Sequence, residues 1–122
     1  MPRKIFAYLE DMKGESTAHL SGFKKVFLTY EDTGSAMTQF AYGIFKPGER
    51  CENHVHPTMM ECFYFISGFG MYKVGGELVR IKPGTFLRIP PNIPHDLRND
   101  GTENLEFVYF GIATNNYTSK LD

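Results

Sequence analysis

The sequence predicts a single all-β domain of the sandwich or barrel class. Its 12 Gly and 7 Pro lie mostly after residue 40, where they separate short runs rich in Phe, Tyr, Val and Ile. Such runs have the composition of β-strands. Turn signals that separate them every ~8–12 residues are typical of a sandwich or a barrel. A chain of 122 residues also has the usual length of one domain and can bury a core of its own.

Seven strands are expected along the chain, in the order of these runs. The first lies at residues 25–30 and is followed by a loop at residues 31–36. The others are expected at residues 39–45, 61–66, 70–74, 77–81, 85–89 and 105–112. Residues 1–36 are less regular, and we expect them to form a strand-and-loop segment that packs on the barrel or on a partner subunit. Residues 37–122 are then expected to form the barrel.

Turn chemistry agrees with this strand order. Val74-Gly75-Gly76-Glu77 predicts a two-residue hairpin turn, because glycine tolerates the positive φ that such turns need. Lys46-Pro47-Gly48 and Lys82-Pro83-Gly84 place Pro before Gly, as β-turns of type I or II do. The prolines at positions 90, 91 and 94 exclude a helix there and favour a bend at the edge of a sheet.

The charge balance argues against a nucleic-acid-binding domain, since 13 scattered Lys and Arg face 14 Asp and Glu. No apolar run approaches the ~18 residues that a membrane helix needs. The apolar stretch at residues 5–9 is too short for a signal peptide. We therefore expect no nucleic-acid partner, no membrane, and a cytoplasmic location in which both cysteines stay reduced.

Three of the four histidines lie between residues 54 and 95, and this clustering indicates a metal site. Side chains two apart on a strand share a face, so His54 and His56 place two imidazoles side by side. Glu61 follows a turn and can return a carboxylate to the same pocket, while His95 follows the proline-rich bend. Three imidazoles and one carboxylate suit Mn, Fe, Co, Ni, Cu or Zn better than Ca or Mg. His19 stands alone in a polar segment and is left out of this set.

The spacing of these residues resembles the two sequence motifs of the cupin superfamily. The first motif is Gly, five residues, His-x-His, three or four residues, Glu, six residues and Gly, which the chain matches at residues 48, 54, 56, 61 and 68. The second is Gly, five residues, Pro-x-Gly, two residues, His, three residues and Asn. The chain matches it at residues 84, 90, 95 and 99, but has Asn92 where the family usually has Gly. Asn is the next-best residue at positive φ, so we expect this turn to form.

The resemblance implies a small single-domain cupin, whose fold is a jelly-roll barrel or double-stranded β-helix of antiparallel strands. By the same resemblance, His54, His56, Glu61 and His95 would bind one divalent transition metal and leave two of six coordination positions open. Similar small cupins are commonly dimers. We therefore expect a homodimer in which the N-terminal strand covers an exposed edge.

Four further residues are candidates for binding a small-molecule ligand, namely Arg88, Tyr42, Met59 and Tyr72. Arg88 is a cation inside an apolar strand, where it binds a substrate anion, pairs with a carboxylate of the protein or lies on the surface. Tyr42 and Tyr72, like Tyr64 and Tyr109, lie in strands and either line a cavity or fill the core. Met59 lies beside the expected ligands and either forms an apolar lip or fills a gap.

Other side chains near the expected ligands have supporting roles. Cys62 follows Glu61 and is expected to face away from the metal by strand alternation. Cys51 is expected near the mouth of the site, and we interpret both cysteines as structural. Asp96 or Asn99 is expected to accept a hydrogen bond that orients an imidazole.

The expected site favours an anionic or chelating molecule, such as a carboxylate, a keto acid or a sugar derivative. A divalent metal with one carboxylate ligand carries a net charge of +1, and it could polarise a carbonyl and stabilise an enediolate. This predicts a Lewis-acid isomerase or decarboxylase. With iron, the same site predicts an oxygen-dependent dioxygenase. A non-catalytic binding module is the third interpretation, because no general base stands out beyond the ligands.

Overall fold

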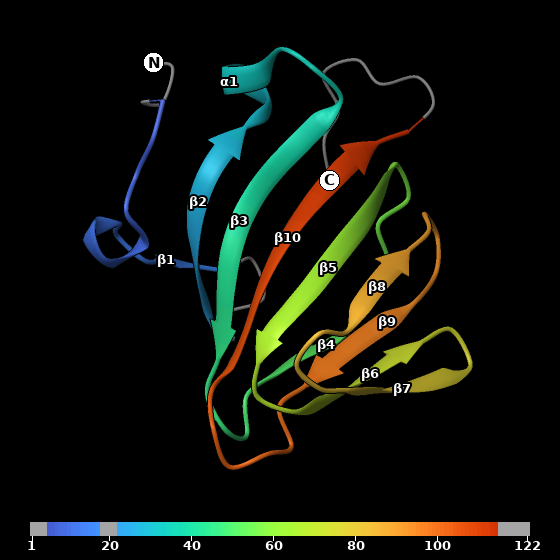
Figure 1. Cartoon of the computed structure of the whole chain (residues 1–122). Helices are drawn as coiled ribbons and strands as arrows, with labels where there is room; N and C mark the ends of the chain where they lie inside the picture. Colours follow the sequence, from blue (N-terminus) through green and yellow to red (C-terminus); the bar gives the residue numbers. More distant parts are fainter. Residues whose placement is uncertain (1–4, 18–21, 115–122) are drawn as a thin grey trace.

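The computed structural model of the chain describes residues 5–17 and 22–114, which form ten strands in two antiparallel sheets (Figure 1). The six-stranded sheet has the order β1 (Glu15–Ser16), β2 (Phe23–Thr29), β3 (Met37–Phe45), β10 (Leu105–Ala113), β5 (Met59–Ser67), β8 (Phe86–Ile89). The four-stranded sheet has the order β4 (Arg50–His54), β9 (His95–Arg98), β6 (Gly70–Val74), β7 (Glu77–Ile81). The two helices described are short, the 3₁₀ helix η1 (Leu9–Asp11) and α1 (Tyr30–Thr33).

One apolar core lies between the two sheets. It joins Phe65 of β5 and Leu105 of β10 to Ile81 of β7, and none of these three side chains is exposed to solvent. Aromatic rings from both sheets are part of the same cluster. The all-β barrel prediction is therefore confirmed. Among the described residues, neither helix has the length or the apolar character needed to cross a bilayer.

All seven expected strands are present, with ends that differ from the prediction by at most two residues. The strands β4 and β9 had no apolar signal of their own, because their sequences, RCENH and HDLR, are mostly polar. The loop predicted at residues 31–36 was wrong in its first half, where α1 forms. Thr29 and Asp32 make a capping box at the start of this helix, and the Thr29 amide donates to Asp32 Oδ2 at 2.8 Å.

The predicted turns are confirmed. The hairpin pairs Val74 with Glu77, as a two-residue loop requires. In both Lys-Pro-Gly turns the residue after Gly donates its amide to the carbonyl of the Lys, at 3.0 and 3.1 Å. The glycines have φ of 88° and 89°, which is the signature of a type II turn. Asn92, which stands where the family motif has Gly, has φ of 67° and so makes the expected left-handed turn ahead of His95.

The described part of the N-terminal segment continues the barrel. β2 hydrogen-bonds along β3, and β1 pairs with β2 at the edge of the six-stranded sheet. Within the described residues, this segment therefore packs on the barrel. The alternative, that it packs on a partner subunit, stays a prediction.

Candidate metal centre

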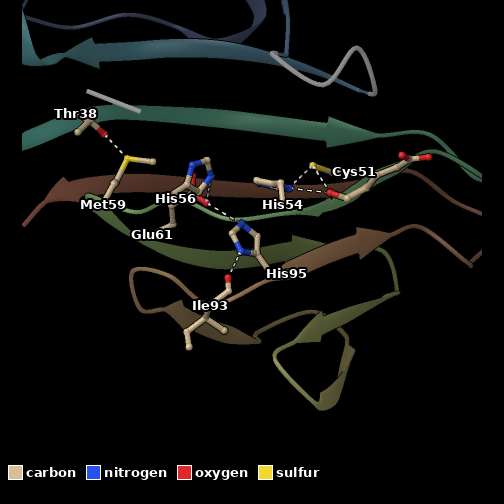
Figure 2. Close-up of polar contacts among 9 residues, drawn as sticks. Thr38, Cys51, His54, His56, Met59, Glu61, Ile93 and His95 are labelled. Atoms are coloured by element: carbon tan, nitrogen blue, oxygen red, sulfur yellow. Dashed lines mark hydrogen bonds and ion pairs between the residues drawn. The ribbon is translucent and has the colours of Figure 1, made fainter. Parts of the chain in front are cut away.

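The four expected metal ligands come together from both sheets (Figure 2). His54 is the last residue of β4, His95 is the first residue of β9, and the two are paired across these strands. His56 follows in the turn after β4, and Glu61 comes from β5 in the other sheet. Their four ligand atoms lie within 4.8 Å of one another. His19 lies outside the described residues.

The Glu61 carboxylate lies between two imidazoles. Its Oε1 is 3.4 Å from Nε2 of His56 and 3.6 Å from Nε2 of His95. Burial alone would raise the pKa of Glu61, but the nearby side chains of His56 and His95 together outweigh burial and lower this pKa to about 2. Glu61 is therefore ionised at neutral pH, as a carboxylate ligand must be.

Backbone carbonyls fix the orientation of two imidazoles. Nδ1–H of His54 donates to the carbonyl oxygen of Glu52, and Nδ1–H of His95 donates to that of Ile93, each at 2.8 Å. A carbonyl oxygen only accepts, so the neutral imidazole carries its proton on Nδ1, and Nε2 is the nitrogen that can act as a ligand atom. The prediction that Asp96 or Asn99 orients an imidazole was therefore wrong for these two histidines.

The residues present fit a transition metal ion. Nε2 of His95 is buried and has no hydrogen-bond partner in the described part of the chain. An unpaired buried nitrogen is costly unless a cation binds it. Three imidazole nitrogens and one carboxylate oxygen also form a donor set that suits Mn, Fe, Co, Ni, Cu or Zn. Four protein ligands leave room on a six-coordinate ion for a bound molecule.

A cavity of about 340 Å³ opens onto this cluster. His54, His56 and Glu61 line one part of it, and His95 lies behind them with only 1% of its surface exposed. Most of the remaining wall is aromatic or aliphatic, and it includes Tyr109. The ligands therefore face a partly open, largely apolar cavity.

The structure brings two of the four ligand-binding candidates to this cavity. Tyr72 and Met59 line the wall. Tyr42 and Arg88 do not line it, because strand alternation turns them to the other face of the six-stranded sheet. The Tyr42 hydroxyl donates to Glu106, and Arg88 is exposed, with Nη1 3.7 Å from Met60 Sδ.

Met59 is held over the sheet beside the cluster. Its Sδ accepts a hydrogen bond of 3.2 Å from Thr38 Oγ1. The pairing of β10 with β3 shifts register between Gly111 and Ile112, which leaves Thr38 as an extra residue in β3. Such bulges re-aim side chains beside functional sites. A side chain on Gly111 would collide with both Thr38 and Met59, so these two side chains would have to move to make room for it.

The cysteines lie on opposite sides of the six-stranded sheet. Cys51 lines the cavity, and its Sγ is 3.5 Å from Nδ1 of His54. Burial, together with nearby carboxylates that include Glu61, raises the pKa of Cys51 to about 12, so its thiol is protonated at neutral pH. Cys62 pairs with Arg88 across β5 and β8 and is absent from the cavity wall, as strand alternation predicted. Neither cysteine forms a disulfide.

The sequence did not point to a polar pair on the cavity wall. Lys24 of β2 and Gln39 of β3 both line the cavity, and Lys24 Nζ donates to Gln39 Oε1 at 2.9 Å. Their positions depend on the pairing of β2 with β3, which no local motif encodes. The carbonyls that orient His54 and His95 could not be predicted either, because every residue has a backbone carbonyl and the sequence does not show which one accepts a hydrogen bond.

Comparison with known proteins places the chain in a family. The model of the cupin domain family matches residues 41–111, which is more than half of the chain. The protein belongs to the cupin family. A polyketide synthase, CurC, of Streptomyces cyaneus is 30% identical over 88 residues, or 72% of this cupin and 57% of CurC. This cupin spans little more than half of the length of the curated relatives it matches.

Solved structures agree on the fold. A predicted oxalate decarboxylase from Thermotoga maritima has a TM-score of 0.83 at 23% identity, over 89% of this cupin and 99% of that chain. A conserved protein with a double-stranded β-helix domain, from Klebsiella pneumoniae, has a TM-score of 0.72 at 21% identity, over 98% and 99%. At these identities the likeness concerns the fold alone. The predicted cupin barrel is thereby confirmed, and the His and Glu cluster fits a metal-binding cupin.

Proposed function

We propose that this cupin is a divalent-metal enzyme that binds a small anionic or chelating molecule and catalyses a Lewis-acid reaction of the isomerase or decarboxylase kind. The observation that carries the proposal is the cluster of His54, His56, Glu61 and His95 at the wall of a cavity of about 340 Å³. A divalent ion there would polarise a bound carbonyl or carboxylate oxygen. One carboxylate leaves the centre with a net charge of +1, which favours an anion.

The two tyrosines of the cavity wall support a role in holding such an anion. Burial and the nearby Glu61 carboxylate raise the pKa of both Tyr72 and Tyr109 above the usual range. Both phenols therefore stay protonated at neutral pH and can donate hydrogen bonds. Their rings flank Phe63, with ring centroids at 5.6 Å for Tyr72 and 5.3 Å for Tyr109. In this arrangement their hydroxyl groups would stabilise negative charge that develops on a bound molecule.

Two other functions remain open for the same site. Among the described residues, the cavity wall has no carboxylate or imidazole beyond the ligand cluster. Without a dedicated base, a non-catalytic binding module is the alternative. Iron in the same donor set would instead support an oxygen-dependent dioxygenase. The identity of the bound metal distinguishes the dioxygenase from the Lewis-acid enzyme.

Exchange of solvent deuterium tests the proposed reaction. Enolisation of a 2-keto or hydroxy-keto acid replaces the hydrogen next to its carbonyl with deuterium, which proton NMR measures. We expect exchange with metal-loaded wild type and with Arg88→Gln, whose side chain lies outside the cavity. We expect no exchange with His56→Ala, which loses the metal. Exchange that survives in metal-free protein would contradict the proposal, and tight binding without exchange across several metals would favour the binding module.

We also propose that the protein is a homodimer and that it resides in the cytoplasm. The dimer proposal rests on the resemblance to other small cupins and on the exposed sheet edges that a second subunit would cover. Light scattering at micromolar concentration tests it, and a monomeric mass would refute it.

A further inference from the structure

We infer that the ligand of this cupin is a flat, conjugated molecule of the size of two fused rings. Its chelating oxygens would face the metal cluster and its ring would lie against the aromatic wall. This inference rests on the proposed metal-dependent function and names the class of molecule that the same site selects.

The first argument is the composition of the cavity wall. Six of its described residues are aromatic, namely Phe23, Phe45, Phe63, Tyr72, Phe107 and Tyr109. The rings of Phe63 and Tyr109 are nearly parallel, with centroids 5.3 Å apart and 13° between their planes. Phe107 lies beside both, at 5.8 and 5.7 Å. Such a wall offers a flat ligand edge-to-face and offset stacking contacts.

The second argument is how few polar groups the wall has. Apart from the metal ligands and Cys51, the described wall offers only Thr17, Lys24, Gln39 and two tyrosine hydroxyls. A sugar or polyol brings a hydroxyl on nearly every carbon, and each one held against the apolar wall without a partner weakens binding. A conjugated ring brings no such requirement.

The third argument is size. A cavity of about 150 Å³ holds benzene, so about 340 Å³ has room for two fused rings. Gln39 pairs with Gly111, and Gly111 pairs with Glu61, so Gln39 lies two strands from the metal cluster. That is about 10 Å between Cα atoms at the usual strand spacing. The Met59 thioether covers Gly111 between them, so the span from the cluster to Gln39 has an apolar floor.

Zinc-loaded protein tests the inference with three probes in isothermal titration calorimetry. Salicylate and 3-hydroxy-2-naphthoate share the same chelating atoms and differ by one ring, while oxalate chelates without a ring. We expect wild type to bind 3-hydroxy-2-naphthoate at least tenfold more tightly than salicylate, because the second ring fills the cavity. Equal affinity, or exclusion of the naphthoate, would overturn the inference.

Variants of Tyr109 locate the effect at the aromatic wall. The readout is the affinity for the naphthoate divided by the affinity for oxalate in the same variant. Tyr109→Leu should lower this ratio by about three- to tenfold, because it removes one aromatic ring. Tyr109→Phe keeps the ring and should preserve the ratio. Tyr64→Leu should also preserve it, since Tyr64 is on the outer face of β5 and is half exposed.

The same measurements separate the inference from the proposed function. If oxalate binds and the ratio does not respond to Tyr109→Leu, the aromatic wall does not select the ligand and the inference fails alone. If neither zinc nor oxalate binds wild type, the proposed metal function fails. Should Tyr109→Leu not fold, Phe23→Leu on β2 takes its place with the same expectation.

Discussion

The two faces of β5 have similar sequences but different roles. Glu61 and Phe63 point into the barrel and line the cavity, and Phe65 packs in the core with no exposed surface. The residues between them point outward, where Tyr64 is 50% and Ile66 is 49% exposed. Both faces are rich in large apolar side chains, so hydrophobicity alone does not distinguish them. The strand alternation set by Glu61 does, because it turns Glu61 and Phe63 to the face that lines the cavity.

Truncation of two neighbouring aromatic residues of β5 should show the largest difference in stability between the two faces. Phe63→Ala should lower the free energy of unfolding by about 3–5 kcal/mol, because it opens a cavity among packed rings. Tyr64→Ala should change it by less than about 1 kcal/mol, as exposed positions usually do. Urea unfolding followed by circular dichroism measures both. Equal losses would show that the two faces do not differ in packing.

Substitution of the two neighbouring polar residues should separate metal binding from the fold. Glu61→Gln removes the only anionic ligand of the described cluster and should weaken metal affinity by about 100-fold, or ~2.7 kcal/mol. Cys62→Ser on the opposite face should leave metal affinity unchanged. Competition with a chromophoric chelator gives both affinities. A large loss in Cys62→Ser would place the metal elsewhere.

Alkaline pH tests the burial of Tyr109, which lines the same cavity from β10. Burial raises the pKa of Tyr109 in the folded state above its unfolded value of about 10. Its contribution to stability is therefore complete below pH 10 and is lost as the pH rises above it. Between pH 9 and pH 11 the free energy of unfolding should fall less in Tyr109→Phe than in wild type. An identical fall would mean that Tyr109 ionises freely.

The sequence could predict the strands and the ligands because both depend on local patterns. Short aromatic runs between turns marked seven strands, and the spacing of His54, His56, Glu61 and His95 indicated a cluster that the structure brings together. Asn92 could be placed at positive φ because few residues tolerate that conformation.

Other features depend on contacts that no local pattern shows. Whether Tyr42 or Arg88 faces the cavity depends on the register of its strand and on which face is buried. Lys24 and Gln39 meet only because β2 pairs with β3. The short helix α1 was missed although Thr29 and Asp32 have the spacing of a capping box, because its four residues have no apolar periodicity.

Elemental analysis of untagged protein purified without added metal tests the central claim most directly. We predict about one equivalent of a divalent transition metal per chain in wild type and in Arg88→Gln, and its loss in His56→Ala and His95→Ala. Iron would favour the dioxygenase, whereas manganese, nickel or zinc would favour Lewis-acid chemistry or binding. Equal metal content in wild type and in His56→Ala would contradict the assignment of this cluster as the metal centre.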